Sequence, residues 1–303
     1  LEKGQIWAGT NDGLVQVTKD GGKNWSNVTP PAKMLPAHGT VVNVEPSHFD
    51  ANTCYVAVDL HQVDNRNPFI FKTTNFGKSW KSISSNLPPS PMSYVHVVKE
   101  DPYRKGLLFA GTENAIYVSF DDGKRWQPLQ SKLPHAPVSW LLIEPNFHDL
   151  VVATYGRGFY ILDDVTPLEQ WSESVKDADV HLFEPRPAYR FRAVSQANLV
   201  PSGMATGDNP PFGATIHYWL KNPVPKPKPD DKDAKSPSEK EKIPVKITIF
   251  DASGEKVRTF RGPNKAGLNR VAWDLRYDSA REVRLRTTPE GNPHVWEEKR
   301  FRG

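Results

Sequence analysis

Short apolar segments alternate with turns rich in Gly, Pro, Asn and Asp along most of the chain. Segments such as Val41–Glu45 and Val95–Lys99 are rich in β-branched residues, which is typical of strands. Long segments with the periodicity of an amphipathic helix are missing. The pattern therefore predicts an all-β protein with many turns.

A motif of strand, tight turn and tryptophan occurs three times. Trp25 and Trp80 are 55 residues apart, Trp80 and Trp126 are 46 apart, and another 45 residues lead to Trp171. A period of about 45 residues is typical of one four-stranded propeller blade. The three segments are VTKDGGKNW, KTTNFGKSW and VSFDDGKRW.

The rest of each period repeats as well, and we name the strands of a blade A to D. The first blade lacks strand A. In the last blade, strands A, B and C are recognisable, but the sequence does not clearly show strand D. The chain is therefore expected to hold three to four blades of a partial β-propeller, over residues 1–172. The expected strands A to D are Val41–Glu45, Thr53–Asp59, Phe69–Thr74 and Ser79–Ile83 in the second blade, and Val95–Lys99, Leu107–Gly111, Ile116–Phe120 and Arg125–Leu129 in the third.

The aligned turns share a hydroxyl residue, an Asp or Asn, a Gly and a Trp. The hydroxyl and carboxylate can accept hydrogen bonds from backbone N–H groups, and Gly supplies a positive φ. Trp then enters strand D and is expected to pack between blades. This motif resembles the Asp-box (BNR) repeats of sialidases and sortilins, where it lies away from the catalytic centre. We interpret the turns as structural; their residues are Thr18, Asp20, Gly22, Trp25, Thr73, Asn75, Gly77, Trp80, Ser119, Asp121, Gly123 and Trp126.

Longer segments sharpen the resemblance. YVAVDLHQVDNRNPFIFKTTNFGKSW, VVATYGRGFYILDDVTPLEQW and HLFEPRPAYRF are similar to the sortilin-like BNR-repeat proteins of bacteria. Those proteins are large and exported, and they carry a glycosyl hydrolase label by similarity alone. The resemblance implies an extracellular or periplasmic location and further propeller blades as partners, but it implies little about activity.

The propeller face opposite the Asp boxes carries the B–C loops and the D–A crossings, where ligand sites are expected. Carboxylates there could act as acid or base, and the arginines could bind an anionic group. The simpler alternative is that the acids form Asx-turns and pair with the arginines. An Asp-x-His-x-x-Asp metal site is less favoured, and neither a metal nor another cofactor is expected. The candidate ligand-binding residues are Asp59, His61, Asp64, Arg66, Glu113, Tyr155 and Arg157.

Two classes of function stay open. A glycosidase needs two carboxyl groups about 5 to 9.5 Å apart, and Asp12, Asp59, Asp64 and Glu113 are the candidates on this face. A sialidase needs three convergent arginines, whereas the loops supply two. We therefore favour a non-catalytic scaffold that binds a peptide or a glycan, with a glycoside hydrolase as the alternative.

The second half has a different pattern. Residues 173–212 are expected to form a connecting segment. Residues 213–303 are expected to form an incomplete Ig-like sandwich. ITIFDASGEKVRTF and AGLNRVAWDLR are similar to the Ig-like modules of flagellar hook-capping proteins and secretion-linked tails. A segment at 222–243, rich in Pro, Lys, Asp and Glu, is expected to be a disordered insertion.

The composition limits the classes of partner that we expect for the chain. Lys and Arg number 39 against 35 Asp and Glu, a net charge of +4, which does not favour nucleic acid. Cys54 is the only cysteine, so no intramolecular disulfide can form. No apolar run reaches the roughly 18 residues of a membrane span. The chain opens on a strand-like segment and closes without one, so we expect a piece of a longer protein, prone to association through unpaired strand edges.

Overall fold

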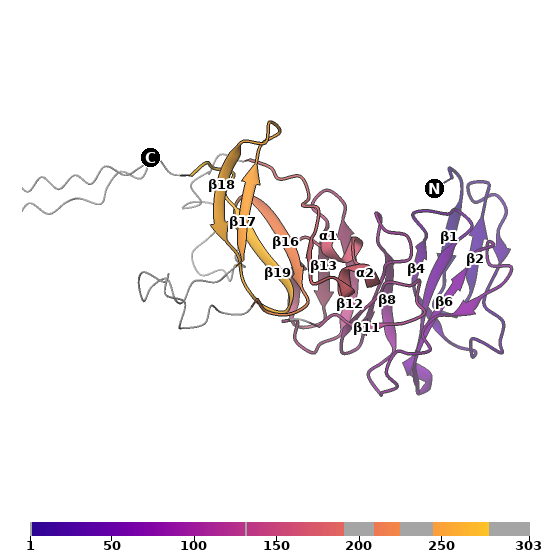
Figure 1. The fold of residues 1–303 in the computed structure, drawn as a ribbon. Helices are drawn as coiled ribbons and strands as arrows, with labels where there is room; N and C mark the ends of the chain where they lie inside the picture. Colours follow the sequence, from indigo (N-terminus) through magenta and orange to yellow (C-terminus); the bar gives the residue numbers. More distant parts are fainter. Residues whose placement is uncertain (1, 131, 191–208, 225–244, 279–303) are drawn as a thin grey trace, which may run out of the picture.

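The computed structural model describes residues 2–130, 132–190, 209–224 and 245–278. Its fold is all-β: antiparallel sheets follow one another along the chain as the blades of a partial propeller (Figure 1). Blades two and three have four strands each, and blades one and four have three. The strands of blades one and two are β1 (Ile6–Gly9), β2 (Val15–Thr18) and β3 (Ser26–Asn27), then β4 (Thr40–Pro46), β5 (Cys54–Leu60), β6 (Asn65–Thr73) and β7 (Lys81–Ser82).

The later blades repeat the same meander. Blade three orders its strands β11-β10-β9-β8, and blade four orders them β12-β13-β14. Strand A carries a β-bulge after the same valine in each of the last three blades: Val41, Val95 and Val138. The strands are β8 (Val95–Glu100), β9 (Leu108–Thr112), β10 (Ile116–Ser119), β11 (Gln127–Pro128), β12 (Val138–Glu144), β13 (Asp149–Thr154) and β14 (Gly158–Leu162).

The Asp-box turns close the C–D hairpins with local hydrogen bonds. In blade one the Thr18 hydroxyl donates to Asp20 Oδ1 at 2.8 Å, and it accepts from the Gly22 N–H at 3.1 Å. Asp20 Oδ1 also accepts from the Asn24 N–H at 2.9 Å. The turns that start at Thr73 and Ser119 form the same bonds, with Asn75 in the place of Asp.

Each seam between blades is a sheet-on-sheet contact. The face of a blade that packs on the next one along the chain is here called its forward face, and the opposite one its backward face. Val97 and Phe109 on the forward face of blade three, for example, pack with Leu141 and Val152 of blade four. Similar clusters join blades one and two and blades two and three. Apolar burial between neighbours therefore holds the row of blades together.

The tryptophans of blades two and three lie in these seams. Trp80 Nε1 donates to the carbonyl oxygen of Val28 at 2.6 Å, and Trp126 packs in the cluster that joins blades two and three. Trp25 of blade one differs: it is 44% exposed, and its indole N–H donates back to Gly22 O at 3.1 Å. The seam position expected for all three tryptophans is therefore occupied by two of them.

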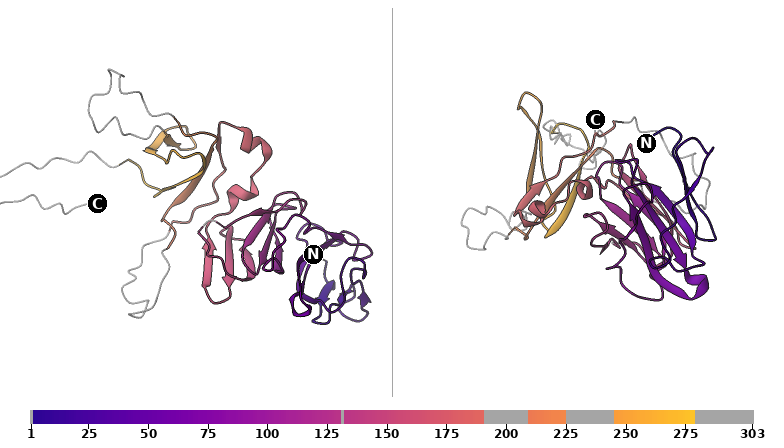
Figure 2. Two further views of the ribbon diagram at one scale, coloured as in Figure 1. Left: turned by 90° about the horizontal axis from the view of Figure 1, so that it is seen from below. Right: turned by 90° about the vertical axis from the view of Figure 1, so that its right-hand side faces the viewer.

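Beyond β14 the chain forms two short helices, α1 (Thr166–Glu169) and α2 (Glu173–Asp177), where a fourth strand was blurred in the sequence. Then β15 (Val180–Leu182), within the expected connecting segment, pairs with β16 (Ala214–Leu220), which pairs with β19 (Gly267–Trp273). A separate hairpin joins β17 (Lys246–Phe250) to β18 (Lys256–Arg261). Figure 2 shows this second unit beside blade four.

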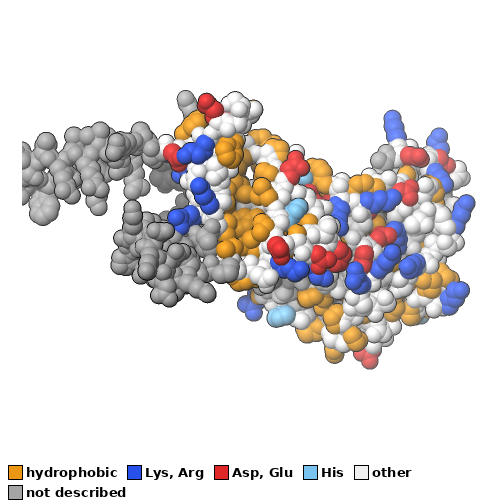
Figure 3. Space-filling model, viewed as in Figure 1, with side chains coloured by type: hydrophobic (Ala, Val, Ile, Leu, Met, Phe, Trp, Pro, Cys, Tyr) orange, Lys and Arg blue, Asp and Glu red, His pale blue; other side chains and the backbone are white. Residues whose placement is uncertain are grey.

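The Ig-like assignment of the second unit stays a prediction, since five short strands in two sheets do not define a sandwich. Most of the expected insertion at 222–243, and the chain after 278, lie outside the described residues. Hydrophobic side chains gather on the visible surface over β16 and β19, whereas Lys, Arg, Asp and Glu are scattered over the blades (Figure 3). On β19, Leu268 is exposed.

Candidate functional site

Blades two and three place a carboxylate at the same position. Cys54 and Leu108 pair with Thr73 and Ser119, the first residues of their Asp boxes. Asp59 and Glu113 each follow five residues later, so both lie at the opposite end of strand B, on the loop face. Neighbouring blades repeat the geometry, and the two carboxylates therefore lie on one side of the molecule.

Each carboxylate is bound to a histidine. Asp59 Oδ2 lies 2.5 Å from Nδ1 of His61, and Asp59 Oδ1 accepts from the His61 N–H at 2.8 Å. Glu113 Oε2 lies 2.8 Å from Nε2 of His96, the second residue of β8. A short 3-10 turn, His61–Val63, positions the first pair, and the strand itself positions the second.

Tyr94 connects the two pairs. The His61 ring stacks on the Tyr94 ring with centroids 4.8 Å apart, and the His96 ring meets it edge-on at 5.3 Å. Burial raises the pKa of Tyr94 to about 12, and the neighbouring carboxylate of Glu113 adds to the shift. Asp59, His61, Tyr94, His96 and Glu113 thus form one continuous group, the Tyr94 cluster.

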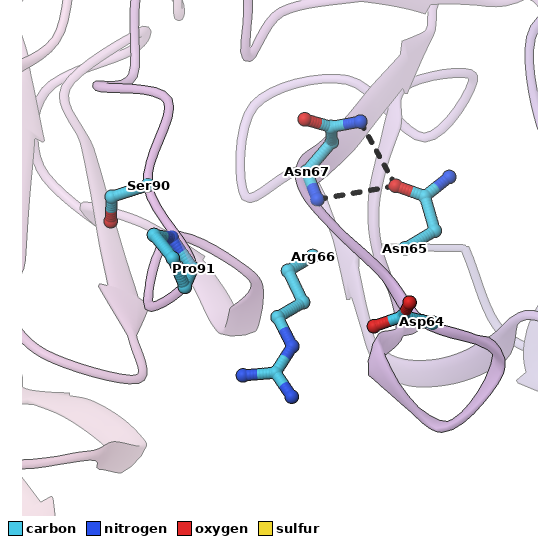
Figure 4. Close-up of a pocket in the computed structure, with 6 residues that line it drawn as sticks. All are labelled: Asp64, Asn65, Arg66, Asn67, Ser90 and Pro91. Carbon is cyan, nitrogen blue, oxygen red and sulfur yellow. Dashed lines mark hydrogen bonds between the residues drawn. The ribbon is translucent and has the colours of Figure 1, made fainter.

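A pocket of about 630 Å³ lies between the B–C loop of blade two and the crossing to blade three. Arg66 extends into it (Figure 4) and has no hydrogen bond or ion pair with any described residue. Its positive charge nevertheless acts on Tyr94, whose pKa it lowers slightly against the other effects. The pocket, here called the Arg66 pocket, is lined by Asp64, Asn65, Arg66, Asn67, Ser90 and Pro91.

The polar groups of the Arg66 pocket are held by bonds within the same segment, at the start of β6. The backbone and side-chain N–H groups of Asn67 donate to Asn65 Oδ1 at 3.2 and 2.9 Å. Asp64 adopts a left-handed conformation, with φ +60°, at the end of the 3-10 turn. The free guanidinium and the amides beside it can bind carboxylate, carbonyl or hydroxyl oxygens.

The remaining candidates lie elsewhere. Tyr155 occupies the position of Asp59 and Glu113 in blade four and is 79% exposed. Among the described residues, no hydrogen bond, ion pair or ring contact joins Tyr155 or Arg157 to the Tyr94 cluster. Asp12 is bonded to the Thr10 hydroxyl within its own turn. The structure thus brings Asp59, His61 and Glu113 together, places Asp64 and Arg66 in the adjacent pocket, and leaves Tyr155 and Arg157 apart.

Sequence reasoning missed Tyr94 and His96. Tyr94 directly precedes strand A of blade three and His96 is its second residue, in a segment whose apolar pattern predicts only a strand. Aligning the three A strands on their bulged valines offers a signal, since His96 then stands where blades two and four have Val42 and Ser139.

Within the described residues, no three His, Cys, Asp or Glu side chains are grouped so that they could hold a metal ion. No helix among them has the length and apolar character needed to cross a membrane.

No protein-family model matches the chain, and no curated protein matches it. Among solved structures, YCF48 bound to D1 peptide is similar over 54% of this chain and 49% of its own, at 22% identity and a TM-score of 0.40. YCF48 from Cyanidioschyzon merolae is similar over 54% and 50%, at 19% identity and 0.39. The GH74 xyloglucanase from Xanthomonas campestris is similar over 75% and 37%, at 13% identity and 0.44. The chain spans half or less of these proteins, and likeness this distant carries no argument about activity.

Proposed function

We propose that the chain is part of an exported, non-catalytic β-propeller protein that binds a peptide or a glycan on its loop face. The observation that carries this proposal is the difference between the two parts of the site. Both carboxylates of the Tyr94 cluster are bonded to histidines, whereas the Arg66 pocket presents hydrogen-bonding groups that have room for a ligand.

The Tyr94 cluster has a structural role beside the ligand site. Asp59 is buried and uses both carboxylate oxygens on His61. Fully satisfied buried networks rigidify their surroundings, so Asp59 fixes the 3-10 turn that leads to Arg66 at the start of β6. Rigid loops bind with less loss of conformational entropy.

The Arg66 pocket suits a ligand rich in oxygen atoms. Arg66 offers several N–H donors, the amides of Asn65 and Asn67 add donors and acceptors, and Pro91 forms an apolar wall. Peptide carbonyls and sugar hydroxyls can both form hydrogen bonds with these groups. Blades from elsewhere in the parent protein are expected to complete the ring around this face.

A glycoside hydrolase is the second candidate. It is favoured by the shared position of Asp59 and Glu113, which places two carboxyl groups on one face of neighbouring blades. Hydrolysis would require one of them to leave its histidine and reach a glycosidic bond.

The decisive experiment screens the chain against glycan arrays and peptide libraries, followed by calorimetry on any ligand found. Arg66→Ala is expected to weaken binding roughly 10- to 100-fold, because a charge-assisted hydrogen bond is worth about 1.5–3 kcal/mol. Arg125→Ala is the matched control, since Arg125 belongs to an Asp box on the opposite face. Equal affinity of both variants and the unaltered chain would place the ligand elsewhere.

The same ligands are then tested for product release. Release by the unaltered chain that is lost in both Asp59→Asn and Glu113→Gln would establish the hydrolase and contradict the binding proposal. Binding without release supports the binding protein.

A further inference from the structure

The Arg66 pocket contains two opposite charges that have no partner among the described residues. Like the guanidinium of Arg66, the carboxylate of Asp64 forms no hydrogen bond or ion pair with any of them. The two residues are two positions apart in the chain, yet their side chains do not pair with each other, and Figure 4 shows them lying separately. Both side chains are exposed, so a ligand can reach each charge.

The carboxylates around the pocket are engaged in a different way. Asp59 and Glu113 are bonded to histidines, and Asp12 of blade one is bonded to a hydroxyl within its own turn. Asp64 therefore differs from the three acids with which the sequence grouped it. Its carboxylate is available to a ligand, as the guanidinium of Arg66 is.

A neutral acceptor stands beside the two charges. Asn65 Oδ1 accepts from the backbone and side-chain N–H groups of Asn67, so the amide of Asn67 presents its Oδ1 to the pocket without a donor from the described residues. In Figure 4 this oxygen points to the side of Ser90. The oxygen can accept a hydrogen bond from an N–H group of a ligand.

The surroundings of Arg66 are not positive overall. Burial and the carboxylates of Glu113 and Asp59 raise the pKa of Tyr94 to about 12, against the lowering effect of Arg66. With Asp64, the site holds three carboxylates against one guanidinium when its two histidines are neutral. A ligand with negative charge alone is therefore repelled by these carboxylates, whereas a ligand that also carries a cation is not.

We propose that the Arg66 pocket binds a peptide segment that carries an acidic and a basic side chain a few residues apart, with the acid on Arg66 and the base on Asp64. This inference rests on the proposed function and chooses the peptide over the glycan. Peptides commonly carry both charges, whereas the hydroxyl and carboxylate groups of most glycans include no cation. The peptide backbone also supplies an N–H group for Asn67.

Fluorescence anisotropy at low salt, with four pools of labelled peptides, tests the proposal. Two positions a few residues apart are fixed as Glu with Lys, Glu with Gln, Gln with Lys, or Gln with Gln, and the other positions hold uncharged residues. The pool with both charges is expected to bind the unaltered chain roughly tenfold more tightly than either pool with one charge, because each charge-assisted hydrogen bond is lost with its partner.

Each side chain of the pocket should account for one charge of the peptide. Arg66→Gln should remove the advantage of Glu and keep that of Lys, and Asp64→Asn should remove the advantage of Lys and keep that of Glu. Asn adopts a positive φ as readily as Asp, and Arg66 is exposed, so both variants should unfold like the unaltered chain. Asp12→Asn is the matched control on the same face and should change neither advantage.

The outcomes separate this inference from the proposed function. A peptide or glycan whose binding is weakened by Arg66→Gln but not by Asp64→Asn would overturn the inference and keep the proposed function. Equal or no affinity for the four pools, a glycan bound more tightly than any pool, or an advantage of Lys that Asp12→Asn also removes would each overturn the inference. Ligand binding that none of the variants alters would overturn both.

Discussion

The indole Nε1 of Trp126 donates a hydrogen bond to the carbonyl oxygen of Ile83, 2.6 Å away and one blade earlier in the chain. The bond is buried, and Trp80 makes the same bond to Val28 across the preceding seam. The Asp-box tryptophan is therefore a side-chain connection between blades as well as an apolar filler.

Trp126→Phe is expected to lower the free energy of unfolding by about 1–3 kcal/mol, because it leaves the carbonyl of Ile83 buried without a donor. Trp25→Phe should change it by no more than about 0.5 kcal/mol, as is usual for an exposed position. Urea unfolding followed by fluorescence or circular dichroism measures both. Equal losses for the two variants would show that the seam bond contributes nothing.

The turn glycines test how tightly the blades approach. Gly123 and Gly156 both have φ near +78°, so an alanine is strained at either position. At Gly123 the added Cβ would also lie 2.7 Å from Ile83 Cδ1, whereas at Gly156 nothing lies within 4 Å. Gly156→Ala is expected to cost about 1 kcal/mol and Gly123→Ala about 1–3 kcal/mol more. The same unfolding measurement compares them, and a Gly123→Ala variant as stable as Gly156→Ala would contradict the close seam.

The Asp20 carboxylate should make stability depend on acid pH. Hydrogen bonds from the backbone and side chain of Asn24, and from Thr18, lower the pKa of Asp20 from 3.8 to about 2. A depressed pKa stabilises the folded state above the unfolded value, and this contribution is lost as the pH falls from about 4 through 2. Asp20→Asn should keep the turn, as Asn75 does in blade two, and reduce the fall in melting temperature between pH 4 and 2. An unchanged pH profile in that variant would refute the assignment.

The Tyr94 cluster can be examined through the tyrosine itself. Because burial and Glu113 raise the pKa of Tyr94 to about 12, Tyr94→Phe should remove a late-ionising component from the alkaline titration. Glu113→Gln should shift that component toward lower pH, since it removes a neighbouring negative charge. Stopped-flow absorbance at 295 nm after a pH jump records ionisation before unfolding. If Glu113→Gln left the component in place, the carboxylate would not be acting on Tyr94.

The sequence predicted the propeller because its signals are local. The bonds of the Asp box join residues two to four positions apart, as between Ser119 and Gly123, so their spacing is visible in the chain itself. The candidate site depends on longer connections. His61 stacks on Tyr94 thirty-three residues later, and only the register of two neighbouring sheets brings those rings together.

The exposure of Trp140 and Phe159 on blade four could not be predicted for a related reason. Both residues have the alternation of ordinary blade strands, and the sequence of a strand does not state whether another sheet covers it. Their exposure is a property of the assembled row. Likewise, Trp25 carries the same motif as Trp126 but has no earlier blade beside it among the described residues.

Each central blade carries one half of two different seams. Its turn Trp bonds the backbone carbonyl of the residue that follows strand D in the blade before it, and its turn Gly approaches that residue's side chain. Val28 and Ile83 are the residues contacted in this way in blades one and two. A blade is thus an interchangeable unit with matching ends. Duplication or deletion of one whole period, of about 45 residues, could lengthen or shorten such a propeller and keep every remaining seam between blades. An insertion or deletion of another length would disrupt the seams on both sides of the altered blade.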